Sequence, residues 1–141
     1  MATGAALISF ARYAFGINNG ASLIRQIGEA EARGVVFSQS EPYPCRGTRK
    51  IVLEYQDELK KGGPSLKPSF TGLKGFMTSK LLVSAIRRAG PGPSREKVFA
   101  ALEALGRFDL GDYVVNDSPV QHRVEPSVDV TIIGSKGKLY K

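Results

Sequence analysis

Several side chains in this sequence are of types that do chemistry, but their spacing does not assemble a reactive set. His122 is the only histidine and Cys45 the only cysteine, so the chain can form neither a Cys-rich zinc site nor an internal disulfide. Ser38 and Ser40 lie outside any Gly-x-Ser-x-Gly nucleophile elbow. The sequence therefore predicts no catalytic group, no metal site and no cofactor, and a small α/β enzyme ranks last among the functions considered.

The charged side chains raise two further hypotheses. Asp109 and Asp112 lie three residues apart in a glycine-containing turn, but the EF-hand pattern that would indicate calcium binding is absent. The formal net charge of +7 is compatible with a basic nucleic-acid-binding domain, whose affinity would fall steeply with salt. The basic residues are scattered and form no stripe interleaved with aromatics. A solvated basic surface without nucleic acid is the favoured interpretation.

Length and composition indicate an ordinary globular chain. The 141 residues are 42% hydrophobic and 23% charged, which suits one domain or a piece of a larger one. The apolar runs are much shorter than the roughly 18 residues of a membrane span. The first ten residues lack the positive start of a signal peptide. We therefore expect no leader within this sequence.

Four helices and a short strand are predicted in the first three quarters of the chain. Apolar residues at helical spacing predict helices over residues 21–33, 49–61, 70–89 and 95–105. Thr48, Ser69 and Ser94 are the expected N-caps of the last three. Gly72 and Gly75 each cost the third helix about 1 kcal/mol relative to alanine, which indicates close packing there. The apolar run 35–37 predicts a buried strand after the first helix.

Beyond Gly106 the pattern becomes that of β-structure. Strands are predicted over 112–116 and 128–133, and the turn Gly134–Gly137 leads into a terminal hairpin strand over 138–140. The order of elements is typical of part of a doubly wound α/β fold. The predicted fold class is therefore α/β, with parallel-sheet layers and a terminal β-hairpin.

Two stretches resemble the type I periplasmic solute-binding proteins, in particular the receptors for branched-chain amino acids. Residues 34–44, GVVFSQSEPYP, resemble the segment in which such receptors cross from one lobe to the other. Residues 68–76, PSFTGLKGF, with the following AIRRAG and SRE, are similar to their long helix, turn and next helix. The resemblance begins near Ala21 and implies the carboxy-terminal portion of a fold that has two lobes in the full-length family.

The resemblance also implies an organisation and a biological setting. Residues 1–20 match poorly, and residues 21–141 contain a crossover near 38–47, a helical section over 48–106 and closing strands over 107–141. The implied ligand is a small amino-acid-like molecule. The full-length parent would be periplasmic and would partner the membrane subunits of an ABC transporter.

Four residues become candidate ligand-binding groups by the same resemblance. Tyr43 lies in the crossover, Ser69 and Phe70 open the long helix, and Asn19 precedes the first helix. Each has a structural alternative: Tyr43 as a rigid aromatic between prolines, Ser69 as a helix cap, Phe70 as a core residue and Asn19 as a turn residue. Because a partial fold leaves sheet edges and helix faces uncovered, we also expect a homodimer and weak or absent ligand binding by the isolated chain.

Overall fold

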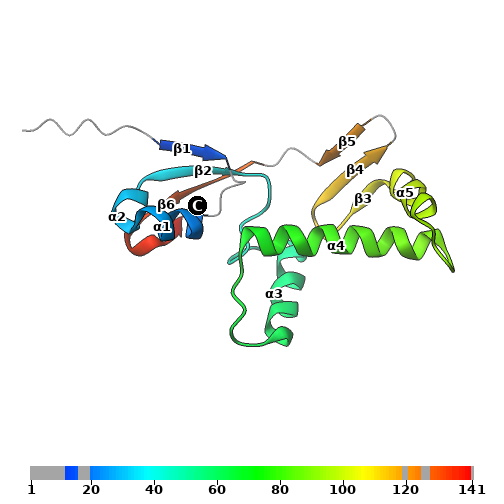
Figure 1. Ribbon diagram of the computed structural model, residues 1–141, viewed down its shortest axis with the longest axis horizontal. Helices are drawn as coiled ribbons and strands as arrows, with labels where there is room; N and C mark the ends of the chain where they lie inside the picture. The colour runs from blue at the N-terminus through cyan, green and yellow to red at the C-terminus, as the bar shows by residue number, and fades with distance from the viewer. Residues whose placement is uncertain (1–11, 16–19, 119–120, 125–127, 141) are drawn as a thin grey trace, which may run out of the picture. The chain divides into compact units, whose positions relative to one another are not determined.

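The computed structural model describes residues 12–15, 20–118, 121–124 and 128–140 (Figure 1). The chain divides into two compact units, one formed by residues 1–39 with 128–141 and the other by residues 40–127. We call them unit 1 and unit 2. Within the described ranges, no helix combines the length and apolarity needed to cross a bilayer.

Unit 1 is built on a four-stranded sheet with the strand order β1-β2-β6-β7. Strand β1 runs parallel to β2, and β6 pairs antiparallel with both β2 and β7. The sheet is therefore mixed, and the predicted α/β class with a parallel strand pair is confirmed. The hairpin of β6 and β7, which turns through the short 3-10 helix η1, is also confirmed. The strands are β1 (Arg12–Phe15), β2 (Val35–Gln39), β6 (Asp129–Ile133) and β7 (Leu139–Tyr140), and η1 covers Ser135–Gly137.

One face of this sheet forms the core of unit 1. Alternate residues of β2 are buried, and Phe37 and Ile133 are fully covered. Helices α1 (Gly20–Ile27) and α2 (Glu29–Ala32) supply Leu23, Ile24 and Ala32 to the same cluster. The predicted single helix over 21–33 is wrong, because Gly28 takes a φ of 85° that a continuing α-helix does not allow.

Unit 2 combines three helices with an antiparallel sheet of order β3-β4-β5. The resemblance predicted closing strands over 107–141 but gave no separate bounds for β3 and β5, and β1 in unit 1 was not predicted. These short strands carry few β-branched residues in an alternating pattern. The elements are α3 (Lys50–Gly62), α4 (Phe70–Ala89), α5 (Arg95–Glu103), β3 (Gly106–Asp109), β4 (Val114–Ser118) and β5 (Gln121–Val124).

The starts of the helices in unit 2 are fixed in two different ways. Ser69 and Ser94 cap α4 and α5 as predicted, each hydroxyl accepting a backbone N–H of the first turn. The predicted cap Thr48 is wrong. Helix α3 instead receives the side chain of Asp112, whose Oδ2 accepts the N–H of Lys50 at 3.1 Å. A cap supplied from 62 residues away leaves no local signal in the sequence.

Candidate ligand-binding site

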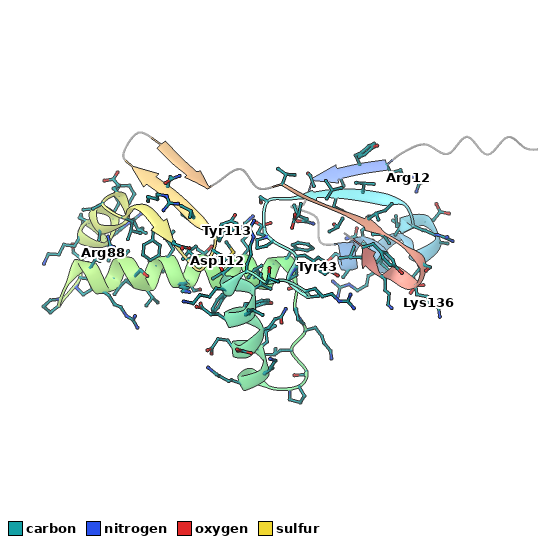
Figure 2. All side chains as sticks on the ribbon, turned by 180° about the vertical axis from the view of Figure 1, so that it is seen from behind. Arg12, Tyr43, Arg88, Asp112, Tyr113 and Lys136 are labelled. Carbon is teal, nitrogen blue, oxygen red and sulfur yellow. The ribbon has the colours of Figure 1, made fainter. Side chains whose placement is uncertain are left out.

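The first turn of α4 contacts the segment that follows β2. The rings of Tyr43 and Phe70 meet edge to face, with centroids 5.9 Å apart and planes at 65°, a favourable geometry for two aromatics. Pro42 and Pro44 on either side of Tyr43 are buried, and Gln56 Nε2 donates to the carbonyl of Pro44 at 2.8 Å. Figure 2 shows Tyr43 beside the start of the long helix. The structure thus brings together two of the four predicted ligand-binding residues.

Ser69 directly precedes Phe70, and its side-chain oxygen also caps α4. Its Oγ accepts the N–H of Gly72 at 3.0 Å, and its own N–H donates to Tyr55 Oη at 3.3 Å. The cap that the sequence predicted is therefore present. A capping hydroxyl still has its own hydrogen to donate, so the ligand-binding role of Ser69 stays a prediction.

The predicted close packing at the two glycines of α4 holds at one of them. A Cβ on Gly72 would lie 2.2 Å from Tyr55 Oη, whereas a Cβ on Gly75 would meet nothing within 4 Å. Tyr55 is itself buried in the core of unit 2. The backbone of α4 can approach α3 at this point only because residue 72 has no side chain.

A half-open hollow of about 260 Å³ lies along the same side of α4 within unit 2. Residues 70, 74, 77 and 81 follow one another at helical spacing and therefore share a face of α4. The wall of the hollow is apolar, with Met77, Leu81, Leu110 and Val115, and its polar groups are Ser40, Glu41, Lys74, Thr78 and Tyr113. A cavity of this kind suits a small molecule with an apolar part and a charged part.

The charges of the hollow come from one ion pair that the sequence did not indicate. Glu41 Oε1 lies 2.9 Å from Lys74 Nζ, and the Glu41 side chain is 8% exposed while that of Lys74 is 62% exposed. A carboxylate so deeply buried requires a cationic partner. The exposed lysine can swing away, which would leave Glu41 open to another cation. This geometry can bind a molecule that carries both an ammonium and a carboxylate.

Tyr113 lines the hollow, and its hydroxyl donates to the carbonyl of Ser40 at 3.0 Å. Burial raises the pKa of Tyr113 above its ordinary value of 10.0, and the Glu41 carboxylate shifts this pKa in the same direction. The folded state therefore favours the neutral phenol of Tyr113 over its phenolate. Sequence reasoning missed this residue because Tyr113 was assigned only to a strand.

Replacing Tyr113 with phenylalanine should change how stability depends on pH. Near pH 8 we expect a loss of about 1 kcal/mol, the net value of one hydrogen bond. The stability that the neutral phenol contributes is present below its unfolded pKa of about 10 and is lost as pH rises through the higher folded pKa. Urea unfolding at pH 8 and pH 11 should show the two proteins converging at the higher pH; parallel pH profiles would contradict the assignment.

Two other residues from the sequence analysis fall outside what the structure describes. Asn19, the fourth candidate, lies in the undescribed range 16–19, and the side chain of His122 is also not described. Cys45 is exposed. Within the described part of the chain, no group of three or more His, Cys, Asp or Glu side chains could hold a metal ion.

Unit 1 contains a polar feature that the sequence did not predict. Gln39 Oε1 and Thr131 Oγ1 are buried and have no hydrogen-bond partner among the described residues. Their residues are only 2% and 1% exposed. Buried polar atoms are normally bonded to protein or to ordered water.

Comparisons with known proteins give one family. A family model described as "Periplasmic binding protein" matches residues 4–138. No curated protein sequence matches the chain. A substrate-binding periplasmic protein from Ralstonia solanacearum is similar in structure, with a TM-score of 0.80 and 25% identity, covering 93% of this chain and 38% of that one. The fold and the sequence therefore point to the same family.

Two further solved structures are similar. A possible leucine/isoleucine/valine-binding protein from Rhodopirellula baltica SH 1 has a TM-score of 0.79 and 29% identity, covering 92% of this chain and 35% of that one. A leucine-binding protein from Thermotoga maritima, at 22% identity and a TM-score of 0.66, covers 91% of this chain and 35% of its own and supports the fold alone. The chain thus spans little more than a third of the length of these structures.

Proposed function

The chain belongs to the periplasmic binding protein family, and from that membership we propose that it is part of the substrate-binding component of an ABC transporter. The proposed ligands are branched-chain or related amino acids, amides or small carboxylates. The similarity to a possible leucine/isoleucine/valine-binding protein at 29% identity supports this ligand class. We propose a periplasmic location and ABC membrane subunits as partners for the full-length parent, and binding without catalysis.

The hollow of unit 2 supports a specific way of holding an amino acid. Glu41 would accept the ligand ammonium in place of Lys74, and Lys74 would pair with the ligand carboxylate. The opened ion pair would thus be replaced by two new ones, so that no charge stays buried without a partner. The apolar wall around Met77 and Leu81 would cover an aliphatic side chain, which is favoured by the removal of apolar surface from water.

The three described candidates are not among the residues that line this hollow, and their proposed role rests on their neighbours along the chain. Phe70 lies one helical turn before Lys74 on α4, and Tyr43 lies two residues after Glu41 and contacts Phe70. We propose that these two aromatics flank the ligand and that Ser69 donates its hydroxyl hydrogen. Asn19 remains a proposed ligand-binding residue on the strength of the family resemblance alone.

The proposal is tested by titrating the labelled chain with leucine, isoleucine, valine, amides and aromatic acids, observed by NMR. The hollow is shallow and half open, so we expect weak binding, with a Kd on the order of 1 mM. Amide shifts should be concentrated at residues 41–43 and 70–78. Removing either charge, with Glu41→Gln or Lys74→Gln, should weaken binding of a zwitterion at least about tenfold, the effect of about 1.4 kcal/mol.

Lys60→Gln is the matched control for the lysine variant. Lys60 is also exposed and also pairs with a carboxylate, Asp57, at 2.7 Å, but it does not line the hollow. This variant should bind like the original chain. The proposed ligand class would be rejected if no amino acid shifted any amide at high millimolar concentration. If Glu41→Gln bound the amino acid as tightly as the original chain, the proposed arrangement of the ligand would be rejected, but the ligand class would not.

A further inference from the structure

Residues 40–44 form a short segment of unit 2 whose backbone is held at both ends by side chains. At its start, Tyr113 Oη donates to the carbonyl of Ser40 at 3.0 Å. At its end, Gln56 Nε2 donates to the carbonyl of Pro44 at 2.8 Å. The two donors belong to different elements, since Gln56 lies on α3 and Tyr113 directly precedes β4. We call residues 40–44 the anchored segment.

The anchored segment is stiff between these two hydrogen bonds. Pro42 and Pro44 each have a fixed φ, and each restricts the residue before it to extended backbone. Those preceding residues are Glu41 and Tyr43. Because a stiff segment moves as one piece, the hydrogen bonds at its ends determine where both of these side chains lie.

Glu41 and Tyr43 both contact the first turns of α4. Glu41 Oε1 lies 2.9 Å from Lys74 Nζ, and the ring of Tyr43 meets that of Phe70 edge to face. Phe70 and Lys74 are one helical turn apart and therefore share a face of α4. A displacement of the anchored segment would change both contacts at once.

Gln56 offers its amide from a rigid support. Its neighbours Val52 and Tyr55 are buried in the core of unit 2, which fixes the backbone of α3 on either side of it. The Gln56 side chain is half-buried, and Pro44 is almost fully buried. A carbonyl in such surroundings is unfavourable without a donor. The anchored segment would therefore leave this position more often if the amide were removed.

We propose that Gln56 is a positioning residue of the ligand-binding site, which holds Tyr43 against Phe70 through the carbonyl of Pro44. Gln56 does not line the hollow, so it acts on the ligand only through the anchored segment. The inference rests on the proposed function, because it assigns Gln56 to the same site. Without the amide, the positioned state of the segment is less populated, and the apparent Kd for an amino acid rises by the same factor.

Gln56→Met tests the proposal, because it keeps the length of the side chain and removes the donor. Leucine, titrated by NMR, should bind this variant about fivefold more weakly than the original chain, the effect of one hydrogen bond. In the ligand-free variant, the nuclear Overhauser effects between the rings of Tyr43 and Phe70 should weaken. Gln26→Met is the matched control, since Gln26 is exposed on α1 in unit 1, and it should change neither measurement.

Two further variants separate hydrogen-bond donation from packing. Gln56→Glu keeps almost the same shape but has no hydrogen to donate when ionised, so it should behave like Gln56→Met. Gln56→Lys keeps an N–H donor on a flexible stem, so it should restore both leucine binding and the ring contact. Circular dichroism of each variant checks the fold.

Unchanged ring contacts in Gln56→Met and Gln56→Glu would overturn the proposal, and so would a constant leucine Kd when the ring contact is lost. A Gln56→Lys variant as weak as Gln56→Met would overturn it too, because packing and not donation would then hold the segment. If the original chain binds no amino acid, the proposed ligand class fails, and the ring contact between Tyr43 and Phe70 alone decides the role of Gln56.

Discussion

Replacing Phe37 with alanine is expected to cost unit 1 about 3–5 kcal/mol, the usual loss for a large aromatic removed from a core. Phe37 is fully buried on the central strand β2, between the parallel partner β1 and the antiparallel partner β6. It packs with Val35 and Ile133, and its ring also approaches Gly20 of α1. No other side chain in this small cluster is large enough to fill the space it would leave.

Native-state hydrogen exchange, measured amide by amide, is the appropriate measurement because the chain has two compact units. The strand amides around Val36 and Ile132 should lose protection equivalent to most of the expected free energy. Phe99→Ala is the control of identical chemistry: Phe99 is 59% exposed on α5, and its removal should cost less than about 1 kcal/mol. Equal effects of the two substitutions would show that Phe37 is not the central core residue of unit 1.

The three helices of unit 2 were the predictable part of this fold, because each carries apolar residues at helical spacing. Ser69 and Ser94 cap α4 and α5 as expected, and glycines follow α3 and α4. The short strands were not predictable in the same way. Strand β5 reads Gln-His-Arg-Val, and it becomes a strand only through its pairing with β4, a tertiary effect that overrides local preference.

The contacts at the candidate site could be predicted from the sequence only in part. The resemblance directed attention to Tyr43 and Phe70, which the structure brings into contact. It gave no reason to select Glu41, since a glutamate between a serine and a proline is usually solvated. The burial of Glu41 and its pairing with Lys74 depend on residues 33 positions apart, and such a pairing has no periodic signature in the sequence.

Gly72 and Gly75 of α4 differ in the space that a side chain would find, and this difference gives the second prediction with a large expected effect. Gly72→Ala should destabilise unit 2 by about 2 kcal/mol, within the usual range for overpacking, because its Cβ would meet the Tyr55 hydroxyl. Displacing that hydroxyl would also break its hydrogen bond from the N–H of Ser69. Gly75→Ala, three residues on, should instead stabilise α4 by about 1 kcal/mol through helix propensity, since its Cβ has open space.

A double substitution separates this contact from a general effect of alanine on α4. Tyr55→Phe alone should cost about 1 kcal/mol by leaving the N–H of Ser69 without its acceptor. Combined with Gly72→Ala, it removes the oxygen that the new Cβ would meet, so the pair should be less destabilised than the sum of the singles by about 1 kcal/mol or more. Urea unfolding followed by far-ultraviolet circular dichroism gives all four free energies. Simple additivity, or a loss of stability in Gly75→Ala equal to that in Gly72→Ala, would mean that α3 and α4 do not depend on the missing side chain at position 72 for their close approach.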